Sequence, residues 1–138
     1  IRLPAKERVL VVELGDEQVA FPFLALAEER VLEAKVGGEP VVAFWAPGTA
    51  SIYSERTADG RDVGAAVGFS AVLDGRRLRF QPTGEDRFRD RQTGTTWSLS
   101  GLGLEGPLEG KRLRQVDEGV HFWFVWAAYR PDTRVVER

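Results

Sequence analysis

The sequence predicts a mainly β fold, a single domain over residues 1–138 with one or two short helices and a mostly antiparallel, curled sheet that forms a barrel or a sandwich. Short apolar segments recur between closely spaced turn dipeptides. Several of these segments alternate apolar and polar side chains with the two-residue period of a strand. The strand–helix–strand rhythm of a parallel sheet is absent, and 138 residues suffice for one buried core.

Two strands and a helix are predicted at the start of the chain. Val9–Leu14 is a short apolar run that ends at Gly15-Asp16, and Gln18–Phe23 follows as its hairpin partner. Pro22 either places the second strand at an edge or ends it, because proline lacks the N–H that a central strand donates. Leu24–Arg30 consists largely of strong helix formers and predicts a helix of about two turns.

A second hairpin is predicted around the Gly37-Gly38 turn. Val31–Val36 alternates apolar and charged residues, as in a strand with one wet face. Pro40–Trp45 is unbroken apolar sequence, which indicates a strand buried on both faces. Ala46–Asp62 is then a long polar excursion, and a loop of that length is either functional or mobile. Ser54–Arg61 is expected to be its least ordered part.

Strand patterns resume in the middle of the chain. Val67–Leu73 predicts a strand that ends at the hairpin dipeptide Asp74-Gly75. Three alternating strands follow, at Arg77–Gln81, Arg87–Asp90 and Thr95–Leu99. Phe88 and Trp97 are expected to point inward. The glycine-rich Gly101–Gly110 predicts a tight irregular loop.

The last part of the chain is predicted to hold the packing centre of the fold. Lys111–Val116 reads as an alternating strand, and Glu118-Gly119 as the turn after it. His121–Thr133, HFWFVWAAYRPDT, is the densest aromatic run, and aromatic side chains bury the most apolar area. Within it, four residues fall at helical spacing: Trp123, Trp126, Ala127 and Arg130.

Two structures fit this aromatic run. A strand over Val120–Phe122 that passes into a short helix is favoured, and Pro131 would end that helix. One continuous buried strand over Val120–Ala128 is the alternative, because short apolar runs are ambiguous. Val135-Val136 predicts a final strand.

Charge and composition exclude several classes of function. A net charge of −2, from 19 basic and 21 acidic residues, gives no electrostatic footprint for nucleic acid or an anionic membrane. No apolar run reaches the length of about 20 residues that a membrane-spanning helix needs. Without cysteine, neither a disulfide nor a thiol site can form. The absence of cysteine, methionine and asparagine, with arginine in excess of lysine, is typical of a thermophilic source or of a GC-rich genome.

His121 is the only imidazole in the chain. It could serve as a general base near neutral pH, but a strand-end histidine with one hydrogen bond is favoured. A hydrolase hypothesis stays open, in which His121, Asp90 and Asp132 meet in one open cleft. Asp90 with Asp132 or Glu105 could in principle form a two-carboxylate pair, although a turn held by Asp90 is favoured. No serine-nucleophile motif is present. No metal or cofactor is predicted, because the sequence lacks the ligand and phosphate-loop patterns that such groups require.

Polar and aromatic residues mix in the second half of the chain, as they do in ligand- and partner-binding surfaces. The candidate binding residues are Asp90, Arg91, Thr93, Trp97, His121, Trp123, Trp126, Arg130 and Asp132. The leading hypothesis is a non-catalytic module that binds an unidentified small ligand or protein partner through them and the 46–62 loop. A purely structural role is the alternative. It predicts buried tryptophans, no cleft, and an arginine stacked on a tryptophan and paired with Asp132.

Three motifs form a specific series, DRQTGTTW at Asp90–Trp97, GPLEG at Gly106–Gly110 and WFVWAAYRPDT at Trp123–Thr133. This series resembles the prokaryotic family named domain of unknown function 3179, over nearly the whole chain. The resemblance implies no activity. It implies an extracytoplasmic location, because members often look secreted or lipid-anchored, and the start at Ile1 leads us to expect a processed or longer precursor.

The resemblance also implies where this chain departs from its relatives. Many members carry CPLCGT where this chain has Phe44–Thr49, so Phe44 and Pro47 occupy the two cysteine positions. Many also have a histidine where this chain has Arg130. A thiol or metal role at those positions is therefore expected to be lost here.

Overall fold

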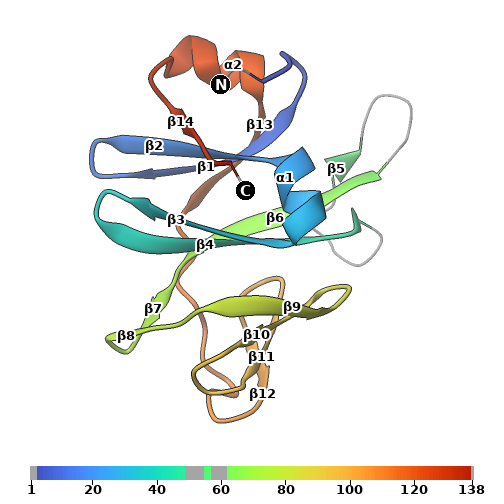
Figure 1. The fold of residues 1–138 in the computed structure, drawn as a ribbon, viewed down its shortest axis with the longest axis vertical. Helices are drawn as coiled ribbons and strands as arrows, with labels where there is room; N and C mark the ends of the chain where they lie inside the picture. Colours follow the sequence, from blue (N-terminus) through green and yellow to red (C-terminus); the bar gives the residue numbers. More distant parts are fainter. Residues whose placement is uncertain (1–2, 49–54, 57–61, 138) are drawn as a thin grey trace.

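In the computed structural model, which describes residues 3–48, 55–56 and 62–137, three sheets are stacked and a short helix covers one end (Figure 1). The strands are β1 (Arg8–Leu14), β2 (Glu17–Pro22), β3 (Val31–Val36), β4 (Glu39–Ala46), β5 (Glu55–Arg56), β6 (Asp62–Ser70), β7 (Val72–Leu73), β8 (Arg76–Arg77), β9 (Phe80–Gly84), β10 (Arg87–Asp90), β11 (Thr96–Ser98), β12 (Gly103–Glu105), β13 (Asp117–Phe122) and β14 (Arg134–Val135). The helices are α1 (Phe23–Glu29) and α2 (Trp123–Tyr129). The predicted mainly β class is confirmed. No sheet of the described residues closes into a barrel, so the sheets stack as in a sandwich.

Each sheet has its own strand order. The first sheet runs β13-β1-β2-β14, the second β3-β4-β6-β5 and the third β12-β11-β10-β9. Paired strands are antiparallel apart from β14, which joins β2 in parallel. The small β7–β8 hairpin leads from the second sheet to the third (Figure 1). The mostly antiparallel prediction is therefore confirmed.

Three apolar clusters fill the spaces between these layers. One lies between the first and second sheets and includes α1, one lies between the second and third sheets, and one joins α2 to the first sheet. β4 contributes side chains to two of these clusters, Val41 and Ala43 to the first and Val42 and Phe44 to the second. All four side chains are fully buried. This explains the unbroken apolar sequence of β4 and confirms its predicted burial on both faces.

Both predicted hairpins and both predicted helices are confirmed. β1 pairs with β2, and β3 pairs with β4. Pro22 ends β2 in extended backbone directly before α1, where its missing N–H costs no hydrogen bond. α2 follows β13 and ends before Pro131, which excludes a continuous strand over Val120–Ala128. None of the described helices is long and apolar enough to cross a membrane.

The strands between the second and third sheets differ in their bounds from the prediction. β6 begins earlier than predicted, and the Val67–Leu73 run is interrupted at Ala71 before β7. The Arg77–Gln81 run is also interrupted, because β8 ends at Arg77 and β9 begins at Phe80. Leu78 N–H donates to the Ala71 carbonyl at 2.8 Å, so the two breaks face each other where the chain changes sheet. Asp74-Gly75 forms the predicted hairpin turn.

The predicted strand over Lys111–Val116 is wrong. This segment forms only isolated bridges, at Arg112 and Gln115. Its buried residues, Leu113 and Val116, are spaced by three rather than by two. The segment carries the chain from the third sheet back to the first, so its burial follows contacts with both rather than the pleat of one strand.

Two glycine segments also differ from the prediction. Gly101–Gly110 contains the short strand β12, although the rest of the segment turns tightly. A Cβ on Gly106 would lie 2.8 Å from the Cα of Thr95, at a φ of +119°. Glu118-Gly119 is no turn but lies within β13, where the register against β1 shifts. Gly119 has a φ of +92°, the left-handed region that such a bulge requires.

The His121–Thr133 segment is not the packing centre of the fold. α2 lies over the outer face of the first sheet, where Trp123 and Trp126 are buried against Val9 and Val11. The two larger clusters lie on either side of the second sheet. The tryptophans are therefore buried as expected, but they anchor a peripheral layer.

Glu17 ties the first sheet to the tip of the β3–β4 hairpin. Its carboxylate accepts hydrogen bonds from the backbone N–H of Gly37 at 3.0 Å and from the guanidinium of Arg134 at 2.9 Å. The Gly37 bond, followed by the Arg134 bond, holds the pKa of Glu17 below its ordinary value.

We expect these bonds to make stability depend on pH. A carboxyl whose pKa is lowered by folding stabilises the native state above its unfolded pKa, and the contribution is lost as the pH falls through the folded pKa. Glu17→Gln should therefore lower the free energy of unfolding at about pH 7 and change it little at about pH 2. Urea unfolding of both proteins at each pH measures this. An equal difference at both values would show that the charge of Glu17 is not the cause.

Candidate functional site

The residues that the sequence singles out fall into two groups in different layers (Figure 1). Asp90, Arg91, Thr93 and Trp97 belong to β10, β11 and the turn between them, in the third sheet. The others, from His121 to Asp132, belong to β13, α2 and the chain after α2, at the opposite end of the molecule. The predicted polar-aromatic region is therefore two separate places.

Asp90 is the centre of the first group and lies fully buried in the interior. Its Oδ2 accepts from the indole N–H of Trp97 at 2.8 Å, and its Oδ1 from the backbone N–H of Thr93 at 2.6 Å. The Thr93 hydroxyl lies 2.9 Å from each carboxylate oxygen and 2.6 Å from Oγ1 of Thr95. Thr95 Oγ1 accepts from the N–H of Leu108 at 3.0 Å. The polar atoms are thus used within the fold, and the group holds the β10–β11 turn.

A similar network closes the end of α2. The indole N–H of Trp126 donates to Thr133 Oγ1 at 2.7 Å, and the Thr133 hydroxyl donates to the carbonyl of Arg130 at 2.7 Å. The Arg130 side chain forms an ion pair with Glu13 at 3.0 Å, where pairing with Asp132 was expected. It lies over a tyrosine ring rather than over a tryptophan.

The groups that a carboxylate hydrolase requires do not converge. His121 Nε2 lies 3.2 Å from the carbonyl oxygen of Glu118, and its ring is 5.0 Å from the ring of Trp126. Asp132 is exposed at the same end, whereas Asp90 is buried at the other end (Figure 1). Within the described ranges, no group of three or more acidic or histidine side chains is placed to hold a metal ion.

The 46–62 loop, which was part of the predicted binding surface, falls largely outside the described residues. Of its Ser54–Arg61 part, expected to be the least ordered, the structure describes Glu55–Arg56. These two residues pair with β6 as the short strand β5, which the sequence did not predict.

α2 exposes an apolar face that the sequence reasoning missed. The helical spacing that turns the two tryptophans inward turns Phe124, Val125 and Tyr129 outward, and these side chains are 52%, 50% and 66% exposed. Phe122, just before the helix, is also exposed, and its ring lies 6.1 Å from that of Phe124. The pattern was visible in the sequence, because a helix that is apolar all round either is covered on every side or exposes an apolar face.

Two grooves lie beside the N-terminal segment and meet at Leu3. The α2 groove has a volume of about 390 Å³ and is lined by Leu3, Ala5, Trp123, Phe124, Ala127 and Ala128. The α1 groove has a volume of about 330 Å³ and is lined by Leu3, Glu7, Pro22, Leu24, Ala25, Glu28, Val135, Val136 and Glu137. The charged residues of the α1 groove are all acidic.

Glu7 holds the N-terminal segment between the two helices. Its carboxylate accepts from the N–H of Leu24 at 3.0 Å, and its carbonyl accepts from the N–H of Trp123 at 2.8 Å. The carbonyl of Ala5 accepts from the N–H of Phe124 at 3.0 Å. These bonds satisfy N–H groups that the first turn of a helix leaves without partners. The walls of both grooves are therefore joined by hydrogen bonds.

Comparison with known proteins gives a family and no characterised relative. The sequence profile of a family described as Protein of unknown function (DUF3179) matches residues 1–133. No curated protein matches the chain. No solved structure matches it either. The matched range includes both hydrogen-bond networks and most of the residues that line the grooves.

Proposed function

The chain belongs to the family described as Protein of unknown function (DUF3179), and we propose that it acts there as a non-catalytic module that binds a partner protein. The bound element is a short segment of the partner that carries apolar anchors and basic side chains. The docking surface consists of α1, the N-terminal segment and α2, with the two grooves between them.

The observation that carries this proposal is the apolar surface around Leu3. Leu24, from α1, is 69% exposed and lines one groove, and Phe124, from α2, is 52% exposed and lines the other. Scattered single apolar residues are normal on a protein surface, whereas contiguous ones beside a groove mark a binding site. The exposed face of α2 extends this surface with Val125 and Tyr129.

Charge favours a basic partner segment. Glu7, Glu28 and Glu137 are the charged residues that line the α1 groove, and each is acidic. Outside residues 71–116 the chain has ten basic and fifteen acidic residues, a net charge of −5. Basic side chains beside the apolar anchors would therefore meet carboxylates at the rim, as complementary interfaces arrange them.

The geometry supports binding over the other two hypotheses. A hydrolase needs His121 and its carboxylates in one cleft, and Asp90 instead lies buried in another layer. A purely structural role agrees with the buried tryptophans of β11 and α2. It gives no reason for two grooves next to exposed aromatic residues, which cost solubility unless they are covered in use.

An extracytoplasmic location is part of the proposal and is supported by the family resemblance alone. Fusion of the natural full-length protein to alkaline phosphatase tests it, because that enzyme needs disulfides and is active only in an oxidising compartment. An inactive fusion that is present at normal level would oppose this location without affecting the binding proposal.

We expect the chain to bind a fluorescent amphipathic peptide of leucine and lysine, measured by anisotropy. Leu24→Lys should weaken this binding by about tenfold, because it removes apolar contact and adds a repelling charge. Thr83→Lys is the matched control, since it adds the same charge at an exposed position of β9, in the third sheet and away from both grooves. Its effect should stay below about twofold.

A second peptide distinguishes binding at this site from non-specific hydrophobic binding. With every lysine replaced by glutamate, the peptide should bind at least about tenfold more weakly. Equal binding of the two peptides, or equal effects of the two substitutions, would overturn the proposal. Thermal unfolding of both variants should match that of the parent, because both altered side chains are exposed.

A further inference from the structure

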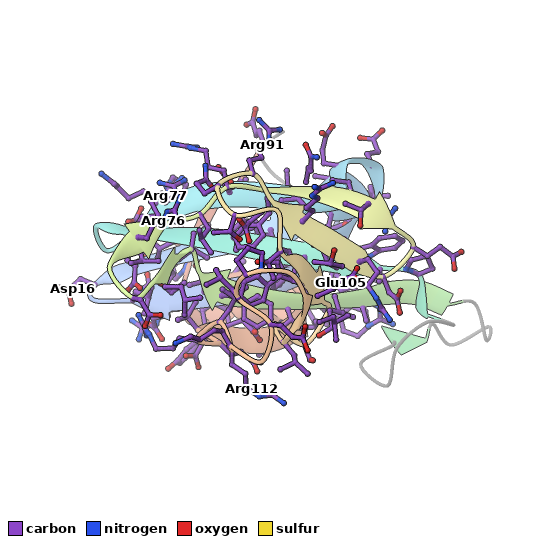
Figure 2. The ribbon with its side chains drawn as sticks, turned by 90° about the horizontal axis from the view of Figure 1, so that it is seen from below. Asp16, Arg76, Arg77, Arg91, Glu105 and Arg112 are labelled. Carbon is purple, nitrogen blue, oxygen red and sulfur yellow. The ribbon has the colours of Figure 1, made fainter. Side chains whose placement is uncertain are left out.

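A second surface lies at the other end of the molecule and is rich in arginine. We call it the arginine face, and its residues are Arg76, Arg77, Arg79, Arg87, Arg89 and Arg91. β10 alternates, so that Phe88 and Asp90 are buried while the arginines between and beside them are exposed. Figure 2, which views this end, shows Arg76, Arg77 and Arg91 on the same side of the molecule, away from Arg112.

The small net charge of the whole chain does not reveal this basic surface, because the two ends of the molecule carry charges of opposite sign. Residues 71–116 carry nine basic and six acidic residues, a net charge of +3, against −5 for the rest of the chain. One of the six acidic residues, Asp90, is fully buried. A net charge of −2 therefore describes neither end of the molecule, and a surface potential depends on the local charges.

Three of the six arginines pair with two carboxylates of the chain itself. Glu33 Oε1 lies 3.3 Å from Arg77 Nη2 and 3.1 Å from Arg79 Nη1. Arg87 pairs with the neighbouring Asp86 at 2.9 Å. Within the described part of the chain, the remaining three have no carboxylate within ion-pair distance: Arg76, Arg89 and Arg91. Their charges are available to a ligand.

The backbone brings these side chains together from different strands. The N–H of Arg91 donates to the carbonyl of Arg79 at 2.8 Å, and the N–H of Arg79 donates to Gln92 Oε1 at 2.7 Å. Arg76 reaches the Gln92 carbonyl at 3.5 Å. Arg89 and Arg91 flank Asp90, whose buried network holds the same turn. The face therefore rests on a fixed part of the fold, which lowers the entropy cost of binding.

We infer that the arginine face binds an extended acidic peptide segment whose carboxylates occupy alternate positions. The guanidinium fork matches a carboxylate with two parallel hydrogen bonds. Alternate residues of a strand, such as Arg87 and Arg89 of β10, stand about 7 Å apart, which is also the spacing of alternate side chains in an extended peptide, and Arg91 follows directly after β10. An extended acidic segment can therefore place one carboxylate opposite each arginine.

The aromatic residues of this sheet favour a peptide over a single-stranded nucleic acid. Phe80, Phe88 and Trp97 are all buried on the inner face. The outer face therefore offers no aromatic platform on which unpaired bases stack. Hydroxyl and amide side chains stand between the arginines instead, because Arg89 lies opposite Gln81 in β9 and Thr96 in β11.

Two labelled peptides of the same composition test this inference. In one, glutamate and threonine alternate, and in the other, the same residues form two blocks. The alternating peptide should bind the intact chain at least about threefold more tightly in fluorescence anisotropy, because only its register matches the arginines. If the face attracted negative charge without regard to its spacing, the two peptides would bind with equal affinity.

Substitutions locate the site. Arg89→Gln and Arg91→Gln should each weaken binding of the alternating peptide by about threefold, the value of one exposed ion pair. Arg112→Gln is the matched control, because Arg112 is exposed at the same end but lies away from Arg91 (Figure 2). Equal binding of both peptides, an equal effect of Arg112→Gln, or displacement by a short DNA duplex at a lower concentration than by unlabelled peptide would each overturn the inference.

Discussion

Replacing Phe44 by alanine is expected to lower the free energy of unfolding by about 3–5 kcal/mol, the range for a large aromatic side chain removed from a close-packed core. Phe44 is fully buried in β4. Its ring stacks on Phe88 with centroids 4.1 Å apart, and it lies 5.3 Å from Phe69 and 5.2 Å from Phe80. The substitution therefore leaves a cavity between the second and third sheets and removes three ring contacts at once.

Phe124→Ala is the matched control, because it deletes the same atoms from an exposed position on α2. Its effect should stay within about 0.5 kcal/mol. Urea unfolding followed by tryptophan fluorescence measures the free energy of unfolding of both variants. An unchanged dependence of this free energy on urea concentration is the check that the transition remains two-state. A cost below about 1.5 kcal/mol for Phe44→Ala would mean that the second and third sheets do not depend on this ring.

Phe44 lies at a position where the family resemblance implies a cysteine in many members. The family resemblance places cysteines at Phe44 and Pro47, and here the first position is the centre of an aromatic cluster. A cysteine at Phe44 would leave much of that volume empty. Phe44 is thus used for packing in this chain.

The sequence predicted those elements whose burial is set by their own strand. Buried and exposed side chains alternate in β10 because one face of the strand is wet, whereas β4 is apolar from Pro40 onward because sheets cover it on both sides. In both cases the pattern of side chains follows the pleat directly. The sequence also predicted the turns at Gly37-Gly38 and Asp74-Gly75, since these residues adopt positive φ at low cost.

The wrong predictions concern segments whose environment is set by distant parts of the chain. Lys111–Val116 looks like a strand, yet it crosses between layers. The N–H of Leu113 donates to the carbonyl of Gly101 at 2.9 Å, and that of Val116 to Gly68 at 2.9 Å. Its backbone bonds thus go to two different sheets, and no local pattern specifies such partners.

The prediction of the candidate site was only partly right, again because the environment of its residues is set by the fold and not by the local sequence. Asp90, Thr93 and Trp97 have the side chains of a binding surface, but a buried network that holds a turn needs the same donors and acceptors. Residue types alone do not separate the two uses, whereas burial does. The exposed apolar face of α2 was missed because the aromatic residues of this helix were interpreted as core, although about half of the helix faces outward.

Replacing Asp90 by alanine is the second substitution with a large expected effect, a loss of about 3 kcal/mol or more in the free energy of unfolding, because buried donors lose their acceptor. The indole N–H of Trp97 and the backbone N–H of Thr93 would remain in the interior without a partner. Asp86→Ala is the control, since it removes a carboxylate from an exposed ion pair with Arg87 and should cost less than about 1 kcal/mol.

A double-mutant cycle with Trp97→Phe isolates the buried bond of Asp90. The two substitutions together should cost at least about 1 kcal/mol less than the sum of the single ones, because removing one partner already forfeits the bond. Additive effects would mean that the bond contributes nothing. Since Arg89 and Arg91 are the chain neighbours of Asp90 on either side, loss of this network should also loosen the arginine face. Asp90→Ala, studied where it is still folded, should therefore reduce the preference for the alternating peptide although no arginine is changed.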